Sequence, residues 1–145
     1  MYVQFKWTQD LTHPIYQHAL EIRKAVFIKD QGIDPQLELD GQDDLYYHVV
    51  GYDQEQPICV ARIKIDRNIL TVQRVAVLSH YQRQGVGRQL MNEIKQFGQS
   101  QSVTQLFLSA QHTAVPFYES LGYTVVEGSQ HMDAGILHFD MKQLI

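Results

Sequence analysis

Alternating apolar and polar residues predict a series of short strands. In residues 3–7 the apolar positions are Val3, Phe5 and Trp7, and residues 45–51 and 58–66 also have strand-like patterns. A polar turn at 53–57 joins the latter two, and a turn at 66–68 leads into a strand over 69–78. Because strands joined by such short turns pair antiparallel, residues 45–78 are predicted to form an antiparallel meander.

Apolar residues at helical spacing predict three helices. In the first, Thr12 is the expected N-cap, Pro14 lies in the first turn, and Gly32 and Pro35 end the helix. The helices are expected over residues 12–32, 85–98 and 114–121, and further strands over 105–109, 123–127 and 136–141.

The order of these elements predicts the fold class. A strand and a helix, with an optional second short helix, precede three strands, a helix, a strand, a helix and two closing strands. The helix between the fourth and fifth strands is a crossover, so these two strands should be parallel. The prediction is a mixed α/β fold in one domain over residues 1–145, with a mostly antiparallel twisted sheet and helices on both faces.

The strand over 69–78 has one irregularity. Its apolar positions are Leu70, Val72, Val75 and Val77. The spacing of two becomes three between Val72 and Val75, and a β-bulge near Gln73 and Arg74 would keep both pairs on one face. Burial of both faces of the strand would explain the same pattern.

Composition narrows the classes of protein to consider. The chain has 145 residues, 44% of them hydrophobic, which suits one domain with a sizeable core. A net charge of −4 argues against a general nucleic-acid surface. The single cysteine, Cys59, allows no internal disulfide, and no apolar run approaches the roughly 20 residues that span a bilayer. With no signal-peptide pattern at the N-terminus, a cytoplasmic protein without membrane partners is expected.

Charge is unevenly distributed along the chain. Residues 30–61 contain eight acidic residues and no Lys or Arg, whereas residues 62–95 contain seven basic residues and two acidic ones. Two solvated faces would explain this distribution. Two ligands would explain it as well, an anion on the later segment and a cation on the earlier one.

The segment YQRQGVGRQL, residues 81–90, combines glycine and positive charge at the predicted start of a helix. Gly85 and Gly87 allow a ligand to approach the backbone closely, and Arg83 and Arg88 add charge. The first helical turn has free N–H groups and the positive end of the helix dipole. The segment therefore indicates a phosphate site, although a tight strand-to-helix turn would also use these glycines.

Two separated motifs resemble the GNAT superfamily of N-acetyltransferases. QRQGVG, residues 82–87, matches the Gln/Arg-x-x-Gly-x-Gly/Ala signature, and PFYESLGY, residues 116–123, resembles Phe-Tyr-Glu-x-x-Gly-Phe. The predicted element order is also the GNAT order, so the resemblance spans essentially the whole chain. It implies the GNAT fold, in which the parallel strands 4 and 5 splay apart.

Further stretches look like the ElaA-like bacterial branch. They are R-x-x-VFI-x-x-QG at 23–32, E-x-D at 38–40, Asp43, Ala110-Gln111 and GILH-x-x-M at 135–141. This chain has Asp30 where the branch usually has Glu, and Leu137 where it usually has Pro. These departures concern the identity of the substrate more than the fold.

The resemblance implies acetyl-CoA as a co-substrate and no metal. Its pyrophosphate would bind the backbone N–H groups of about Arg83 to Arg88, and its pantetheine arm would pair with the strand at Val75 and Val77. A backbone N–H there could hold the oxyanion formed from the thioester. The implied cofactor-binding residues are Val75, Ala76, Val77, Gln82, Arg83, Gln84, Gly85, Val86, Gly87, Arg88, Gln111, Phe117 and Tyr118.

Acetyl transfer to an amine needs an acid for the leaving thiolate and a route for the amine proton. Tyr118 is the candidate acid, or else a core tyrosine, and Cys59 between Ile58 and Val60 is expected to be a buried thiol rather than a nucleophile. His112 and His138 can titrate near neutrality. The candidate acceptor-binding residues are Arg23, Glu38, Asp40, Asp43 and His138. The acids among them could instead belong to a solvated loop.

These observations favour an N-acetyltransferase that moves an acetyl group to a primary amine by direct attack in a ternary complex. A non-catalytic acyl-CoA-binding or sensing module is the alternative, as is a phosphate-binding domain for another nucleotide, which the missing nucleotide motifs disfavour. Expected partners are acetyl-CoA and an amine, and a homodimer is suggested by analogy with such folds alone.

Overall fold

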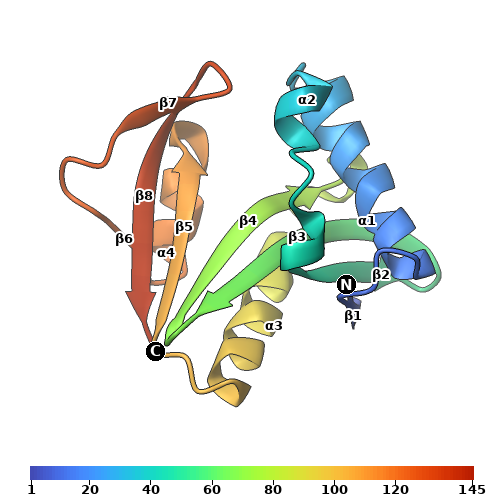
Figure 1. Ribbon diagram of the computed structural model, residues 1–145, viewed down its shortest axis with the longest axis horizontal. Helices are drawn as coiled ribbons and strands as arrows, with labels where there is room; N and C mark the ends of the chain where they lie inside the picture. Colours follow the sequence, from blue (N-terminus) through green and yellow to red (C-terminus); the bar gives the residue numbers. More distant parts are fainter.

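In the computed structural model, which describes residues 1–145, an eight-stranded sheet is covered by helices (Figure 1). The strands are β1 (Gln4–Thr8), β2 (Tyr47–Asp53), β3 (Gln56–Asp66), β4 (Ile69–Val77), β5 (Gln105–Gln111), β6 (Thr124–Val125), β7 (His131–Asp133) and β8 (Ile136–Leu144). The order is β1-β2-β3-β4-β5-β8-β6, with β7 beside β8, and every pair is antiparallel except β4–β5. The mixed α/β class, the meander and the parallel pair are confirmed.

The helices lie on both faces of the sheet. They are α1 (Pro14–Arg23), α2 (Pro35–Glu38), α3 (Val86–Ser100) and α4 (Val115–Ser120). One apolar cluster joins α1 to β2 and β3 through Ala19, Ile22, Val50 and Val60, all buried. A larger cluster joins α3 and α4 to the other face, and its members include Leu90, Ile94, Leu106, Tyr118 and Met141.

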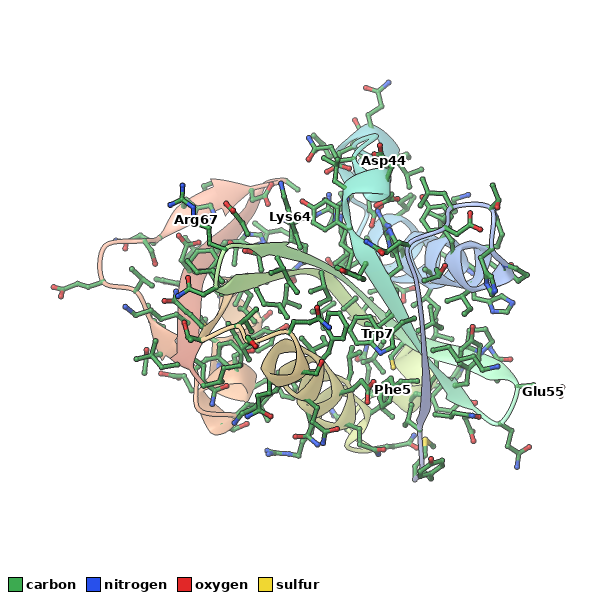
Figure 2. The ribbon with its side chains drawn as sticks, turned by 60° about the horizontal axis from the view of Figure 1, so that its bottom comes forward. Phe5, Trp7, Asp44, Glu55, Lys64 and Arg67 are labelled. Carbon is green, nitrogen blue, oxygen red and sulfur yellow. The ribbon has the colours of Figure 1, made fainter.

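The larger cluster extends to the edge of the sheet at β1. Phe5 and Trp7 lie on the side of β1 that faces α3 (Figure 2). The Trp7 ring stacks on Phe97 with the ring centres 4.3 Å apart, and its Nε1 donates to Glu93 Oε2 at 2.8 Å. This contact attaches the N-terminal strand to α3.

The bulge predicted in the fourth strand is present in β4. Val60 pairs with Ala76 and Arg62 with Gln73, so two steps along β3 face three along β4. Arg74 takes up the extra residue in a left-handed conformation, with φ +56°. A non-glycine residue adopts this conformation at some cost, which marks a locally constrained backbone.

Strands β4 and β5 pair for only part of their length. The parallel register runs from Ile69–Gln105 to Val72–Leu108 and then stops. Beyond it the two strands diverge (Figure 1), so the edge of residues 73–77 that faces β5 has no strand partner. This divergence creates the site described below.

Several element bounds differ from the sequence-based prediction. The N-cap of α1 is His13 rather than Thr12, because the His13 ring accepts from Ile15 N at 3.1 Å. The predicted first helix continues past α1 as a π-helical segment, Lys24–Asp30. Leu45 lies in a 3-10 turn before β2 and is exposed, and β7 was not predicted.

Candidate active site

A cavity of about 620 Å³ lies where β4 and β5 diverge. Its walls come from Gln73–Val77 of β4, the turn before α3, Leu108–Gln111 of β5, α4, and the segments around Phe27 and Glu38. The volume suits a ligand of cofactor size. Segments far apart in the sequence therefore share one site.

The glycine turn forms one end of this cavity. Gly85 is the N-cap of α3 with φ +81°, a left-handed conformation that glycine adopts without strain. The first backbone hydrogen bond of α3 runs from Gln89 N to Gly85 O, which leaves the N–H groups of the preceding helical residues for another acceptor. The turn is therefore able to hold an anion at the positive end of a 15-residue helix.

Gly87 is favoured by close packing rather than by its backbone conformation. A Cβ placed on Gly87 would lie 3.1 Å from Cζ of Phe117, whose ring also lines the cavity. Gln82 Nε2 donates to Val77 O at 3.0 Å and fastens the turn to the end of β4. The side chain of Gln84 instead bonds His80 O, and Gln84 is the one predicted cofactor residue outside the cavity wall.

Tyr118 of α4 is buried, and its side chain lines the cavity. Burial raises the pKa of Tyr118 well above its usual range, so the phenol keeps its proton at neutral pH. Its hydroxyl makes no hydrogen bond within the protein, and it is not among the fully buried polar atoms that lack a partner, so it has access to the cavity. The hydroxyl is thus a proton donor that faces the site.

Cys59 is fully buried in β3 and does not line the cavity. Burial raises the pKa of its thiol to about 12, so the thiolate is scarce at neutral pH. This environment agrees with the expectation of a structural thiol.

His138 of β8 is the histidine that lines the cavity. Its Nδ1 lies 2.7 Å from Ile136 O and must donate, so in the neutral ring Nε2 carries the lone pair. The ring stacks on His131 at 5.7 Å between centres. His138 can therefore accept a hydrogen bond or a proton, whereas His112 is exposed and lies outside the wall.

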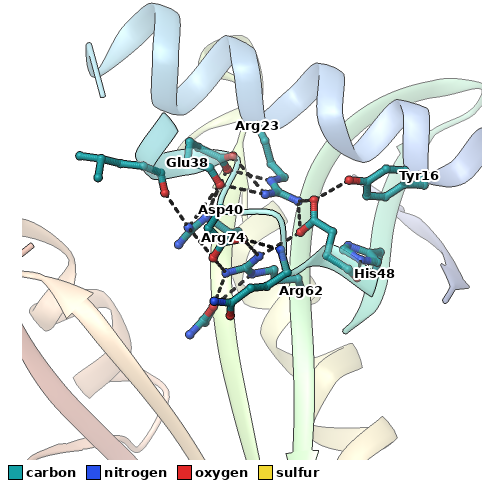
Figure 3. Close-up of polar contacts among 11 residues, drawn as sticks. Tyr16, Arg23, Glu38, Asp40, His48, Arg62 and Arg74 are labelled. Atoms are coloured by element: carbon teal, nitrogen blue, oxygen red, sulfur yellow. Dashed lines mark hydrogen bonds and ion pairs between the residues drawn. The ribbon is translucent and has the colours of Figure 1, made fainter. Parts of the chain in front are cut away.

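The acidic segment forms an internal ion-pair network (Figure 3). Arg23 of α1 bonds both carboxylate oxygens of Glu38, at 2.8 and 3.0 Å, and also bonds Asp43. Arg62 of β3 bonds both oxygens of Asp40, at 3.0 and 2.8 Å, and shares Asp43 at 2.9 Å. Three carboxylates thus meet arginines that come from outside residues 30–61.

The predicted acceptor-binding residues lie in different places relative to the cavity. Arg23, Asp40 and Asp43 lie outside the cavity wall, and of the predicted acceptor residues only Glu38 and His138 line it. The acids do not face the cavity as free charges. Glu38 and Asp43 are buried and paired with arginines, as buried carboxylates must be, and Asp40, whose side chain is 26% exposed, is paired with Arg62.

Arg74 lines the same end of the cavity and was not among the predicted site residues. Its position in the predicted bulge was the one signal for it in the sequence. Burial, with Arg62 nearby, lowers the pKa of Arg74 from the usual arginine value. For Arg23 burial acts the same way, but hydrogen bonds and charge from Glu38 outweigh it and raise the pKa. Arg74 is therefore the least compensated of the three arginines.

No group of three or more His, Cys, Asp or Glu side chains is arranged to hold a metal ion. None of the helices has the length and apolar character needed to cross a bilayer.

Comparison with known proteins agrees with this geometry. A family model described as an acetyltransferase (GNAT) domain matches residues 17–145. YjcF of Bacillus subtilis (strain 168), named as an uncharacterized N-acetyltransferase, is 32% identical over 125 residues, which cover 86% of this chain and 89% of YjcF.

Solved structures share the fold across the whole chain. ElaA of Escherichia coli has a TM-score of 0.84 at 24% identity, with 98% of this chain and 99% of ElaA covered. The PaiA N-acetyltransferase of Thermoplasma acidophilum, solved in complex with coenzyme A, has a TM-score of 0.72 at 13% identity and covers 100% of both chains. With the family model matching nearly the entire sequence, the chain belongs to the GNAT family of acetyltransferases.

Proposed function

We propose that this acetyltransferase moves the acetyl group of acetyl-CoA to a primary amine by direct attack in a ternary complex. The observation that carries the proposal is the single cavity that joins the glycine turn, the unpaired edge of β4 and the Tyr118 side chain. The coenzyme A bound to a relative of the same fold supports the choice of donor.

The donor would bind along one continuous surface. The pyrophosphate would accept hydrogen bonds from N–H groups at the start of α3, beside Arg83 and Arg88. The pantetheine arm would run along the β5-facing edge of Val75 to Val77, which has no strand partner. This placement brings the thioester to the region between β4 and Tyr118.

Each step of the reaction then has a group suited to it. The amine nitrogen attacks the thioester carbon, and a backbone N–H of the bulged strand stabilises the oxyanion. When the C–S bond breaks, the protonated Tyr118 hydroxyl donates a hydrogen bond, or its proton, to the departing thiolate. The proton released by the amine passes to water in the open cavity or to Nε2 of His138. Cys59 takes no part, because its thiol is buried and protonated.

The acceptor would enter from the end of the cavity lined by Glu38, Arg74 and His138. This end carries a carboxylate as well as an arginine, whereas the glycine turn carries the two arginines Arg83 and Arg88 and no acid. Two ligands can therefore approach the thioester from different ends, as a ternary complex requires.

Free thiol released from acetyl-CoA, measured across a broad panel of primary amines, tests the proposal. We expect thiol release that depends on one class of amine, with an equal amount of acetylated amine. Binding of acetyl-CoA without thiol release on any amine would favour the non-catalytic acyl-CoA-binding module instead.

A further inference from the structure

Three arginines and three carboxylates form a cluster of ion pairs that reaches the cavity at Glu38 and Arg74 (Figure 3), and the N–H donors of the three arginines are unequally used. Every nitrogen of the Arg23 and Arg62 guanidinium groups donates to a protein oxygen. Both side chains are essentially fully buried, with 0% and 2% exposed. These two arginines have no donor left for a ligand.

Arg74 differs from both of them. Its side chain is 22% exposed, and its contacts with Glu38 and Asp40 are long, at 3.4 and 3.6 Å. Nε and Nη2 donate to the carbonyl groups of Leu37 and Glu38 at the end of α2, whereas Nη1 has no acceptor in the protein. The two N–H groups of Nη1 therefore remain free on a side chain that lines the cavity.

The carboxylates near Arg74 are committed to the other arginines. Both oxygens of Glu38 accept from Arg23 at 3.0 Å or less, and both oxygens of Asp40 accept from Arg62 at 3.0 Å or less. Arg74 therefore keeps two free N–H donors beside ion pairs that are longer than those of Arg23 and Arg62, and such donors can bind an added anion. A carboxylate is an anion of this kind, because its oxygen accepts a charge-assisted hydrogen bond from a guanidinium N–H.

We propose that Arg74 binds a carboxylate group of the acceptor, so that the acceptor is an amine of the amino-acid class. The inference rests on the proposed function. Arg74 sits at the bulge of β4, the strand along which the donor is proposed to lie, so it can orient the amine of such a molecule toward the thioester.

Matched substrates test the inference through thiol release. We would compare each common amino acid that has a primary amine with its decarboxylated amine and its carboxamide, which bracket the amino acid in basicity. For the preferred side chain, kcat/KM should be about 10- to 100-fold higher with the free carboxylate, the effect of one charged hydrogen-bonded contact. Equal values for the three forms would overturn the inference and leave the proposed function standing.

Variants assign the preference to Arg74. Arg74→Asn removes the guanidinium group and keeps a residue that tolerates a left-handed backbone. Its ratio of kcat/KM between the amino acid and its decarboxylated amine should fall close to one. Arg67→Asn is the matched control, since Arg67 has φ +59° and lies at the tip of the β3–β4 hairpin (Figure 2). It should keep the wild-type ratio.

Other outcomes count against the inference. If Arg74→Asn lowers kcat/KM equally for the amino acid and for its decarboxylated amine, the role of Arg74 is only to anchor α2. If that variant does not fold, Arg74→Gln replaces it, because Gln54 shows that glutamine adopts a left-handed backbone in this protein, and an unchanged ratio there overturns the inference. Faster turnover of an aminophosphonate analogue would assign the site to a phosphate-class anion instead. Absence of thiol release with every amine would overturn the proposed function and this inference together.

Discussion

The Tyr118 hydroxyl is the group whose chemistry can be isolated most cleanly. It faces the cavity without a protein partner, and burial keeps it protonated. Tyr118→Phe preserves the ring and its contacts with Phe117 and Tyr123 and removes only the oxygen. If Tyr118 is the general acid, kcat should fall by roughly 10²–10⁴, with acetyl-CoA affinity nearly unchanged. Steady-state kinetics with a direct binding titration would measure both.

Tyr123 provides a matched control one contact away. Its hydroxyl is buried without a partner, and it lies outside the cavity wall. Tyr123→Phe should therefore keep wild-type kcat, with stability unchanged or slightly higher, because an unpaired buried hydroxyl is costly. A Tyr118→Phe variant that behaved like this control would make Tyr118 a core residue, with water as the proton donor.

Single residues were predictable from the sequence where the chemistry lies in one contiguous segment. The glycines and arginines of residues 82–88 form such a segment, because a helix start holds an anion with its own backbone. The arginine partners of the acids were not predictable. Arg62 lies 22 residues from Asp40, and Arg74 lies 36 residues from Glu38. Such pairs depend on how strands and helices pack, which composition alone does not give.

The ion-pair network holds α1, α2, β3 and β4 together through Asp43 and its neighbours (Figure 3). Hydrogen bonds from Arg62 hold the pKa of Asp40 well below its usual range. Burial alone would raise the pKa of Asp43, but hydrogen bonds from Tyr16 and Arg23 lower it overall. Because the unfolded carboxylates take up protons first, the free energy of unfolding should fall as pH drops below about 4.

His48 should lower the free energy of unfolding at a higher pH than the carboxylates do. Its ring is buried and donates from Nε2 to Asp43 O, and burial lowers its pKa. The unfolded state therefore binds this proton first, and stability should begin to fall near pH 6.5, about the usual histidine pKa.

The Asp43→Asn variant tests whether the ion-pair network stabilises the fold and causes the loss of stability at low pH. It leaves two buried arginines undercompensated, so it should cost about 3–5 kcal/mol in unfolding free energy at pH 7 and flatten the fall below pH 4. Urea unfolding between pH 7 and pH 3 would measure this. Asp44→Asn is the neighbouring control on an exposed carboxylate (Figure 2) and should change stability by no more than about 0.5 kcal/mol. Equal unfolding free energies for the two variants would mean that Asp43 behaves as a residue of a solvated loop.

Helices and strands were predictable where apolar residues recur at a regular spacing, and less so where contacts with other elements set the conformation. The slip from two to three residues in Leu70–Val77 indicated the bulge, because side-chain alternation is a property of the strand itself. The π-helical continuation of α1 and the short β7 carry no such period. The π-helical segment lines the cavity through Val26 and Phe27, and β7 pairs with β8. The conformations of both segments therefore depend on tertiary contacts.

The arrangement of the sheet explains why the site lies where it does. The crossover through α3 makes β4 and β5 parallel, and their register ends at Val72–Leu108. The two strands diverge beyond that point (Figure 1). A strand edge, a helix start and α4 line the one cavity that lies there. Acetyl-CoA should bind there, once per chain, with its phosphates at the glycine turn.

Calorimetric titration of acetyl-CoA into Gly85→Val, with Gly128→Val as control, measures whether the glycine turn holds the phosphates of acetyl-CoA. Both glycines have left-handed backbones, φ +81° and +77°, with nothing within 4 Å of an added Cβ, so the two changes strain the fold alike. Only Gly85 lines the cavity. Gly85→Val should weaken acetyl-CoA binding about 10-fold or more through lost backbone contacts with phosphate, while Gly128→Val binds like wild type. Wild-type affinity for acetyl-CoA in a folded Gly85→Val, Gly87→Val double variant would show that the phosphates do not bind at the glycine turn.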